Sequence, residues 1–156
     1  MDRRKQILSE LRYLEDYRCA IRLMHDDIAH MTDDINLLTA DINRHNSDID
    51  QHSADININS PDIKNDSLVL KRESLIEERS DLLLCLRVTV NQVSRIERLL
   101  LLLPEEDQLI LDKMLIHPYR NSAFDLMETL HCEKSWLYKH RAAALDTLCR
   151  LRYGAG

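Results

Sequence analysis

The chain has 156 residues, a net charge of −6 and few turn-forming residues, with two glycines and three prolines. Both glycines, Gly154 and Gly156, lie at the C-terminal end, and two glycines cannot supply the turns that a sheet protein needs. The composition therefore excludes a β-rich fold and predicts an all-α protein with few, short connections. The negative net charge argues against a protein that binds nucleic acid without selectivity.

The first 59 residues carry a seven-residue repeat. Every seventh residue from 7 to 56 is isoleucine or leucine, and a second, mostly apolar series follows three positions later, starting at residue 17. This spacing is the a/d pattern of a left-handed coiled coil, and it predicts one long helix over residues 2–59. The two series are Ile7, Leu14, Ile21, Ile28, Ile35, Ile42, Ile49 and Ile56, and Tyr17, Met24, Met31, Leu38, His45 and His52.

The segment Ser60-Pro61-Asp62 interrupts this helix and starts the next one, because proline is tolerated in the first turn of a helix but not in its interior. We expect the tip of a hairpin near residues 58–67 and a second helix over residues 68–103. The second helix has a leucine-rich stripe and many arginines, so antiparallel pairing with the acidic first helix is electrostatically favourable. Residues 1–103 are therefore predicted to form a coiled-coil hairpin.

The first of these helices is the longer one, so its N-terminal part needs a partner other than the second helix. That partner is either the C-terminal helices of the same chain or a second copy of the protein. The seam that would pair in a homodimer supplies the candidate oligomerisation residues, which are Ile7, Leu14, Tyr17, Ile21, Met24 and Ile28.

The cysteines and the apolar segments indicate the compartment. Four cysteines are widely spaced without a Cys-x-x-Cys pair, which predicts reduced thiols rather than a disulfide or zinc framework. The N-terminus has no apolar core of a signal peptide, and the four leucines at 100–103 are too few to span a membrane. A cytoplasmic protein without a membrane partner is expected.

Residues 104–156 follow the pattern of a small three-helix domain. Pro104 with the acidic residues after it suits a helix start, and residues 117–121 form a linker. Ser122 is the expected cap of the next helix, and residues 131–133 make a tight connection to the last one. A helix-turn-helix is therefore predicted over residues 122–148. The last helix carries apolar residues at helical spacing, namely Leu137, Ala144, Leu145 and Leu148.

The positive charge of the chain is concentrated in this last helix. Residues 134–152 carry five basic side chains against Asp146 alone. Cations neutralise phosphates, whereas polar and aromatic groups contact base edges. The alternative is that the tryptophan packs against the coiled coil or anchors a partner protein, while the cations are merely solvated. The candidate DNA-binding residues are Lys134, Lys139 and Arg141 for phosphates, and Ser135, Trp136 and Tyr138 for the groove.

The same segment resembles region 4 of bacterial sigma factors, which reads the −35 promoter element. The resemblance rests on the Leu103-Pro104 opening, the Asp125-Leu126 pair, the short turn and the ending Ala144-Leu145-x-x-Leu148. A coiled-coil part joined to such a domain resembles the small phage regulators of late genes of the ArpU and RinA type. The sigma pattern usually has glycine where His131 stands, serine or threonine where Glu133 stands, and a smaller residue where Trp136 stands. The resemblance implies a promoter-proximal site and RNA polymerase as a further partner.

Two functions are expected from these patterns. The first is a phage or prophage transcription regulator that binds double-stranded DNA as a homodimer in the cytoplasm of a bacterial host. The alternative is a non-enzymatic phage protein whose acidic coiled coil binds and inhibits or retargets a host complex, either RNA polymerase or a nucleic-acid-binding defence complex. No enzyme is expected, because the chain lacks a Gly-rich phosphate loop, a nucleophile elbow and a His-Glu-x-x-His motif. No metal site and no cofactor is predicted.

Overall fold

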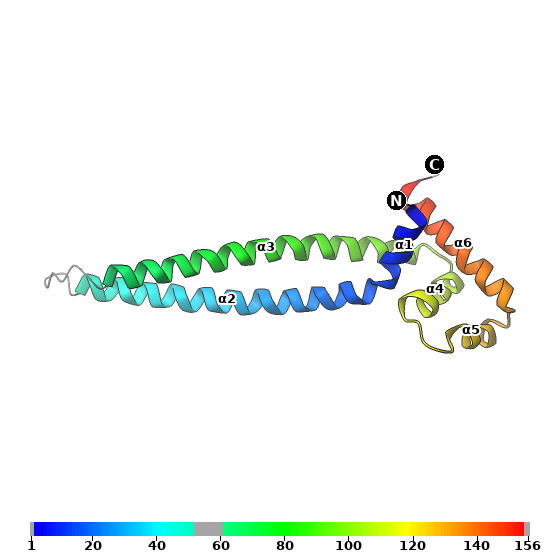
Figure 1. Cartoon of the computed structure of the whole chain (residues 1–156), viewed down its shortest axis with the longest axis horizontal. Coiled ribbons are helices and arrows are strands. Elements are labelled where there is room, and N and C mark those ends of the chain that lie inside the picture. The colour runs from blue at the N-terminus through cyan, green and yellow to red at the C-terminus, as the bar shows by residue number, and fades with distance from the viewer. Residues whose placement is uncertain (1, 52–60, 155–156) are drawn as a thin grey trace. The chain divides into compact units, whose positions relative to one another are not determined.

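The computed structural model describes residues 2–51 and 61–154, and within this part every regular element is helical (Figure 1). The all-α class that the shortage of turn residues predicted is confirmed. None of the described helices is both long enough and apolar enough to cross a membrane. In chain order the elements are α1 (Arg3–Arg12), α2 (Leu14–Gln51), α3 (Pro61–Leu101), α4 (Glu105–Leu111), the π-helical turn η1 (Asp112–Ile116), α5 (Ser122–Leu130) and α6 (Lys134–Tyr153).

The helices form two compact units. The terminal unit contains Met1–Ala20 and Thr89–Gly156, and the hairpin unit contains Ile21–Val88. A boundary between residues 103 and 104 was expected, but the structure groups the start of α2 and the end of α3 with the C-terminal helices. Burial explains the difference, because Leu14, Val93, Ile96 and Leu103 are all buried within the terminal unit.

The hairpin unit consists of the larger parts of α2 and α3, which run antiparallel. The Asn65 side-chain amide donates to Asn46 Oδ1 at 3.0 Å, and Arg79 Nη1 donates to Thr32 Oγ1 at 3.2 Å. Residue numbers therefore rise along one helix as they fall along the other. The buried residues between the two helices are Ile35, Ile42 and Leu86, and the first two belong to the predicted heptad seam.

The ends of the long helices differ from the sequence-based expectation. Helix α3 begins at Pro61, so residues 61–67 are helical rather than part of the hairpin tip. This start suits proline, whose missing N–H would be unpaired in a first helical turn in any case. The rest of the expected tip, residues 58–60 with the Ser60 cap, lies outside the described residues. The seam residues His52 and Ile56 also lie outside them.

The predicted helix over residues 2–59 is divided at Tyr13, where the backbone has φ −98° and ψ 9°. The Tyr13 N–H still donates to Ser9 O at 3.0 Å, and its carbonyl accepts from Tyr17 N–H at 2.9 Å. The chain therefore changes direction at one residue with its helical hydrogen bonds largely retained. This change allows α1 to pack against α6.

Helix α1 contributes to the core of the terminal unit. Ile7 and Leu11 are buried, as are Ile96 of α3 and Leu148 of α6, and these four residues line one small space. Ile7 and Leu14 are 4% and 0% exposed in a single chain, so these two candidate oligomerisation residues are covered without a second copy. The other four candidates, Tyr17, Ile21, Met24 and Ile28, are half-buried.

A buried ion pair joins helices α1 and α6. Arg152 Nη1 of α6 bonds Glu10 Oε2 of α1, and both side chains are almost fully covered, at 11% and 8% exposed. Gln6 donates a further hydrogen bond to the other carboxylate oxygen of Glu10 at 3.3 Å. Because both charges have left water, each depends on the other for compensation.

We predict that Arg152→Ala lowers the free energy of unfolding by about 3–5 kcal/mol, because it leaves the Glu10 carboxylate buried without its cation. Chemical denaturation followed by circular dichroism measures the change. The matched control is Arg150→Ala, on the same helix but exposed, which should change the stability by no more than about 0.5 kcal/mol. Equal losses for the two variants would contradict the assignment.

Candidate nucleic-acid interface

Helices α5 and α6 form a helix-turn-helix in the segment where the sequence predicted one, although α6 extends to Tyr153 beyond the expected end at residue 148. Helix α5 spans Ser122–Leu130, the connection is His131–Glu133, and α6 begins at Lys134. The turn depends on His131, whose φ of 51° and ψ of 48° lie in the left-handed region. This backbone conformation lets Cys132 N–H donate to Met127 O at 3.1 Å, which satisfies a carbonyl at the end of α5.

A small core holds the two helices against α4. Ile110, Leu126 and Leu137 are fully buried at its centre, one from each of the three helices. Ser122 takes a different role from the one expected, since Asn121 precedes α5 and Ser122 is its first residue. The Ser122 hydroxyl accepts from Tyr119 N–H at 2.7 Å and donates to Tyr119 O at 2.8 Å, so it closes the preceding turn.

Four of the six candidate DNA-binding residues are exposed, all in the first half of α6: Lys134, Ser135, Tyr138 and Lys139. Successive residues of a helix are about 100° apart, so Ser135 and Lys139 lie on the side opposite Leu137 and Ala144, which are buried. The outer face of the first half of α6 is thus a short polar and cationic surface.

The remaining two candidates lie at the flanks of this surface and are half-buried. Trp136 stacks on His140 with ring centroids 3.6 Å apart, and it packs against the Ile110–Leu126–Leu137 core. Of the alternatives for this tryptophan, packing is therefore what the structure shows, although against the core of the helix-turn-helix rather than the coiled coil. Trp136 also lines a hollow of about 420 Å³ with Glu106, Leu130, His131, Cys132 and Glu133.

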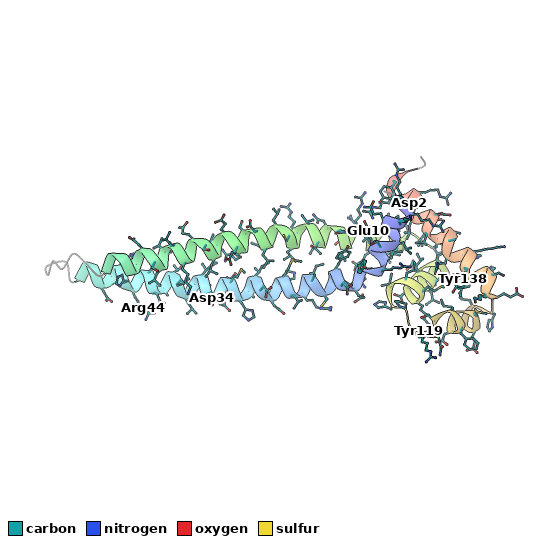
Figure 2. All side chains as sticks on the ribbon, viewed as in Figure 1. Asp2, Glu10, Asp34, Arg44, Tyr119 and Tyr138 are labelled. Carbon is teal, nitrogen blue, oxygen red and sulfur yellow. The ribbon has the colours of Figure 1, made fainter. Side chains whose placement is uncertain are left out.

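On the other flank, the Arg141 guanidinium lies over the Tyr138 ring, 5.3 Å from its centroid. Figure 2 labels Tyr138 on α6. A stacked guanidinium keeps its charge and its N–H groups while losing rotational freedom, so it is oriented before any ligand arrives. The pair suits a contact with a phosphate oxygen.

Two arginines change the charge of α6 in a way that the sequence did not indicate. Arg4 of α1 pairs with Asp146 across 3.5 Å, which offsets the one acidic side chain of residues 134–152. Arg152, counted among the basic residues of this segment, is instead buried with Glu10. Arg4 and Asp146 are 142 positions apart in the chain, and no local pattern connects them.

The acidic side chain nearest the start of α6 is Glu133. It occupies the N-cap position with an extended backbone, but its side chain makes no capping hydrogen bond. A negative charge here interacts favourably with the helix dipole, and it repels a phosphate at the same place. Glu133 is therefore a determinant of how strongly α6 attracts an anion.

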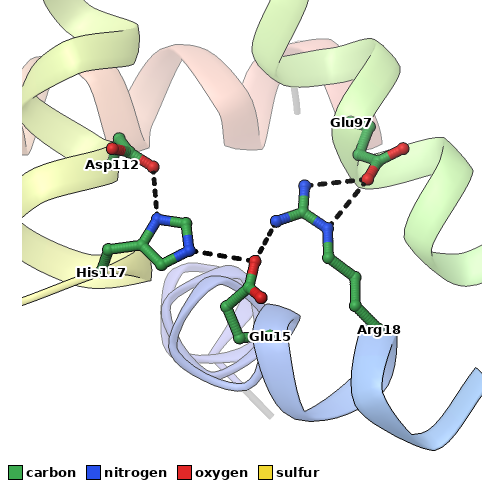
Figure 3. Close-up of polar contacts among 5 residues, drawn as sticks. All are labelled: Glu15, Arg18, Glu97, Asp112 and His117. Atoms are coloured by element: carbon green, nitrogen blue, oxygen red, sulfur yellow. Dashed lines mark hydrogen bonds and ion pairs between the residues drawn. The ribbon is translucent and has the colours of Figure 1, made fainter. Parts of the chain in front are cut away.

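A polar network within the terminal unit joins α2, α3 and the η1 region (Figure 3). Arg18 of α2 binds Glu97 of α3 at 2.8 Å and also pairs with Glu15. His117, directly after η1, lies with Nδ1 2.8 Å from Asp112 Oδ1 and Nε2 3.0 Å from Glu15 Oε1. Neutral imidazole has one N–H, so both contacts are hydrogen bonds only when the ring is protonated.

The pKa values respond to this arrangement in opposite directions. The hydrogen bond to Asp112, with the Glu15 contact, raises the pKa of His117 above its ordinary value of 6.5. The hydrogen bond from Arg18, with that from His117, lowers the pKa of Glu15 below 4.5. A raised histidine pKa stabilises the fold at low pH, and this stabilisation is lost as the pH rises through the folded value. A lowered glutamate pKa stabilises the fold at pH values above the ordinary pKa of the glutamate. Glu15 and His117 therefore both contribute fully between about pH 4.5 and 6.5.

Comparison of the chain with protein families, with curated proteins and with solved structures gives no match.

We predict that His131→Gly raises the free energy of unfolding by about 1 kcal/mol, because glycine adopts the left-handed conformation of residue 131 without steric cost. Thermal unfolding measures the change. His131→Ala is the matched control, since it removes the same side chain and keeps the Cβ. A gain in stability with alanine as large as with glycine would mean that the imidazole, and not the backbone, is responsible.

We also predict that the wild-type chain loses more stability between pH 5.5 and 8 than His117→Gln does, because deprotonation removes the His117 ion pairs. The difference should be at most about 1 kcal/mol, since half of the ring is in solvent. Melting temperatures across this range measure it. A pH profile for His117→Gln that is the same as that of the wild type would contradict the network's role.

Proposed function

We propose that the chain is a non-enzymatic transcription regulator of the phage or prophage type, which binds a promoter-proximal site in double-stranded DNA through α5 and α6. The observation that carries this proposal is the exposed group Lys134, Ser135, Tyr138 and Lys139 on the first half of α6. In a helix-turn-helix, the N-terminal residues of the second helix are the ones that reach base edges in the major groove.

Each exposed side chain has a distinct role in this proposal. Lys134 and Lys139 neutralise phosphates on the two sides of the groove, and Arg141, held by Tyr138, contacts a third phosphate. Ser135 and the Tyr138 hydroxyl read base edges, because a hydroxyl can both donate and accept a hydrogen bond. Trp136 positions α6 from behind, through His140 and the core.

The resemblance to sigma region 4 adds the expected setting. Promoter-proximal binding next to RNA polymerase, in the cytoplasm of a bacterial host, is the role that such a domain implies. The small number of phosphate contacts means that the salt dependence of binding should be moderate. Three contacts give a slope of log K against log salt of about −2.7 for each chain.

We predict that Lys139→Glu weakens binding to duplex DNA by about tenfold or more at low salt and reduces the salt slope by about one. The DNA is a fragment selected from a random duplex pool by the wild-type protein, and fluorescence anisotropy measures the affinity. Lys5→Glu, an equal charge change at an exposed position of α1, is the matched control and should bind the DNA as the wild type does.

We predict that Glu133→Ser binds the same DNA fragment more tightly than the wild type does, because the substitution removes a negative charge beside the phosphates. The same anisotropy measurement tests this.

A second function is favoured by the charge of the hairpin unit. This unit carries seven basic and 14 acidic residues in the sequence, a net charge of −7, while the rest of the chain has +1. Asp26, Asp27, Asp33 and Asp34 are exposed on α2. An acidic helical surface suits the basic channel of a host complex that binds nucleic acid, such as RNA polymerase or a defence complex. Stoichiometric capture of such a complex by Lys139→Glu/Arg141→Glu, combined with equal DNA affinities for Lys139→Glu and Lys5→Glu, would favour this function over promoter binding.

A further inference from the structure

Helix α3 carries a second seam beside the stripe that faces α2. Within the hairpin unit, Ile76 and Leu83 are 39% and 45% exposed, although both are large apolar residues. The buried Leu86 marks the stripe of α3 that faces α2, and Leu83, three residues earlier, lies about 60° around the helix from it. Leu84 and Val88 widen the exposed apolar surface.

The spacing of this seam is that of a coiled coil. Residues 69, 73, 76, 80, 83 and 87 follow one another at alternating steps of four and three, which keeps them on one line along a helix. The outer seam, defined as Val69, Glu73, Ile76, Ser80, Leu83 and Arg87, is thus apolar at every second position. A partly exposed heptad seam at the flank of a helical hairpin offers a further helix a surface on which to pack.

The charges of the outer seam identify this helix as α3 of a second copy. Glu73 and Arg87 lie seven residues before and seven residues after Ser80, so they carry opposite charges at equal distances from a small residue. Among the ion pairs of the described residues, none involves either side chain. Such a surface is complementary to itself when it is turned by a two-fold rotation, which is the requirement for a symmetric dimer.

We propose that two copies of the chain associate through the outer seams of their α3 helices, antiparallel and centred on Ser80. Glu73 of each copy then faces Arg87 of the other, and Ile76 of each copy lies beside Leu83 of the other. Ser80 meets Ser80 at the two-fold axis, where small side chains allow the helices to approach closely. A parallel arrangement would instead place Glu73 against Glu73 and Arg87 against Arg87, and like charges in register destabilise such a pair.

The surface differs from the seam of α2 that the sequence indicated for a homodimer, since Ile7 and Leu14 are already covered within one chain. Self-association is measured without DNA, so either proposal can fail while the other stands.

The first test is sedimentation velocity of the full chain. Wild type is expected to be a dimer at micromolar concentration, and Leu83→Glu should weaken the dimer by about a hundredfold or more, because it places a charge in the apolar seam. Leu37→Glu is the matched control, since Leu37 is 65% exposed on α2, outside the outer seam, and it should leave the dimer intact. Equal helical circular dichroism for the three proteins shows that folding is unchanged. A monomeric wild type, or equal loss of the dimer with Leu37→Glu, overturns the proposal.

The second test uses charge reversal. Glu73→Arg and Arg87→Glu should each weaken the dimer by about tenfold, because each puts like charges opposite one another twice. The double variant Glu73→Arg/Arg87→Glu should restore the wild-type affinity. Failure of the double variant to recover any affinity would overturn the predicted pairing.

The third test distinguishes the two directions of pairing by disulfide cross-linking, with the four native cysteines replaced by serine. Ser80→Cys should form a cross-linked dimer on oxidation, because it lies at the two-fold axis. Glu73→Cys should not, since the two introduced thiols would be about 21 Å apart along the seam at 1.5 Å per residue. Cross-linking of both variants would indicate parallel helices and would contradict the proposal.

Discussion

Helix α6 is packed by the N-terminal helix along its second half, where Leu148 is buried and Arg152 pairs with Glu10. Its first half is anchored differently, through Leu137 in the core formed with α4 and α5. One helix of 20 residues therefore belongs to two packing arrangements. Because one side of its second half packs against another part of the chain, its first half can expose polar side chains without losing its position.

This double packing also determines where positive charge is available. Burial removes Arg152 from the surface, and Arg4 offsets Asp146 farther along the helix. Lys134 and Lys139 remain exposed near the start of α6, and Arg141 is oriented by Tyr138. Positive charge that is confined to the first half of α6 can attract an anionic ligand to that surface. The acidic hairpin unit, in contrast, disfavours unspecific binding of nucleic acid to its own surface.

The two proposals are compatible with each other in their symmetry. A dimer with a two-fold axis presents two copies of the helix-turn-helix, and dimeric proteins of this kind bind half-sites that are related by the same symmetry. The outer seam of α3 and the exposed face of α6 are made of different residues, so association and DNA binding do not compete for the same side chains. The proposals thus assign the hairpin unit a role in self-association beside a role as an acidic surface.

Local patterns in the sequence were sufficient for the helices and for most of their boundaries. The shortage of glycine and proline predicted the all-α class, the heptads predicted paired long helices, and the apolar spacing after residue 122 predicted α5, its turn and α6. The face of α6 was predicted in part, because helical periodicity separates exposed Lys139 from buried Leu137. Periodicity alone did not show that Trp136 packs against the core.

Long-range packing decided the remaining features. The ion pair between Glu10 and Arg152, the pair between Arg4 and Asp146, and the network around His117 each join residues far apart in the chain. No local spacing encodes such pairs, and the two that involve α1 form because the chain changes direction at Tyr13 and α1 lies on α6. The sequence by itself determined which segments are helices and which faces of them are apolar. The tertiary structure decided which charges are buried and which remain at the surface, since burial depends on what the rest of the chain places beside each residue.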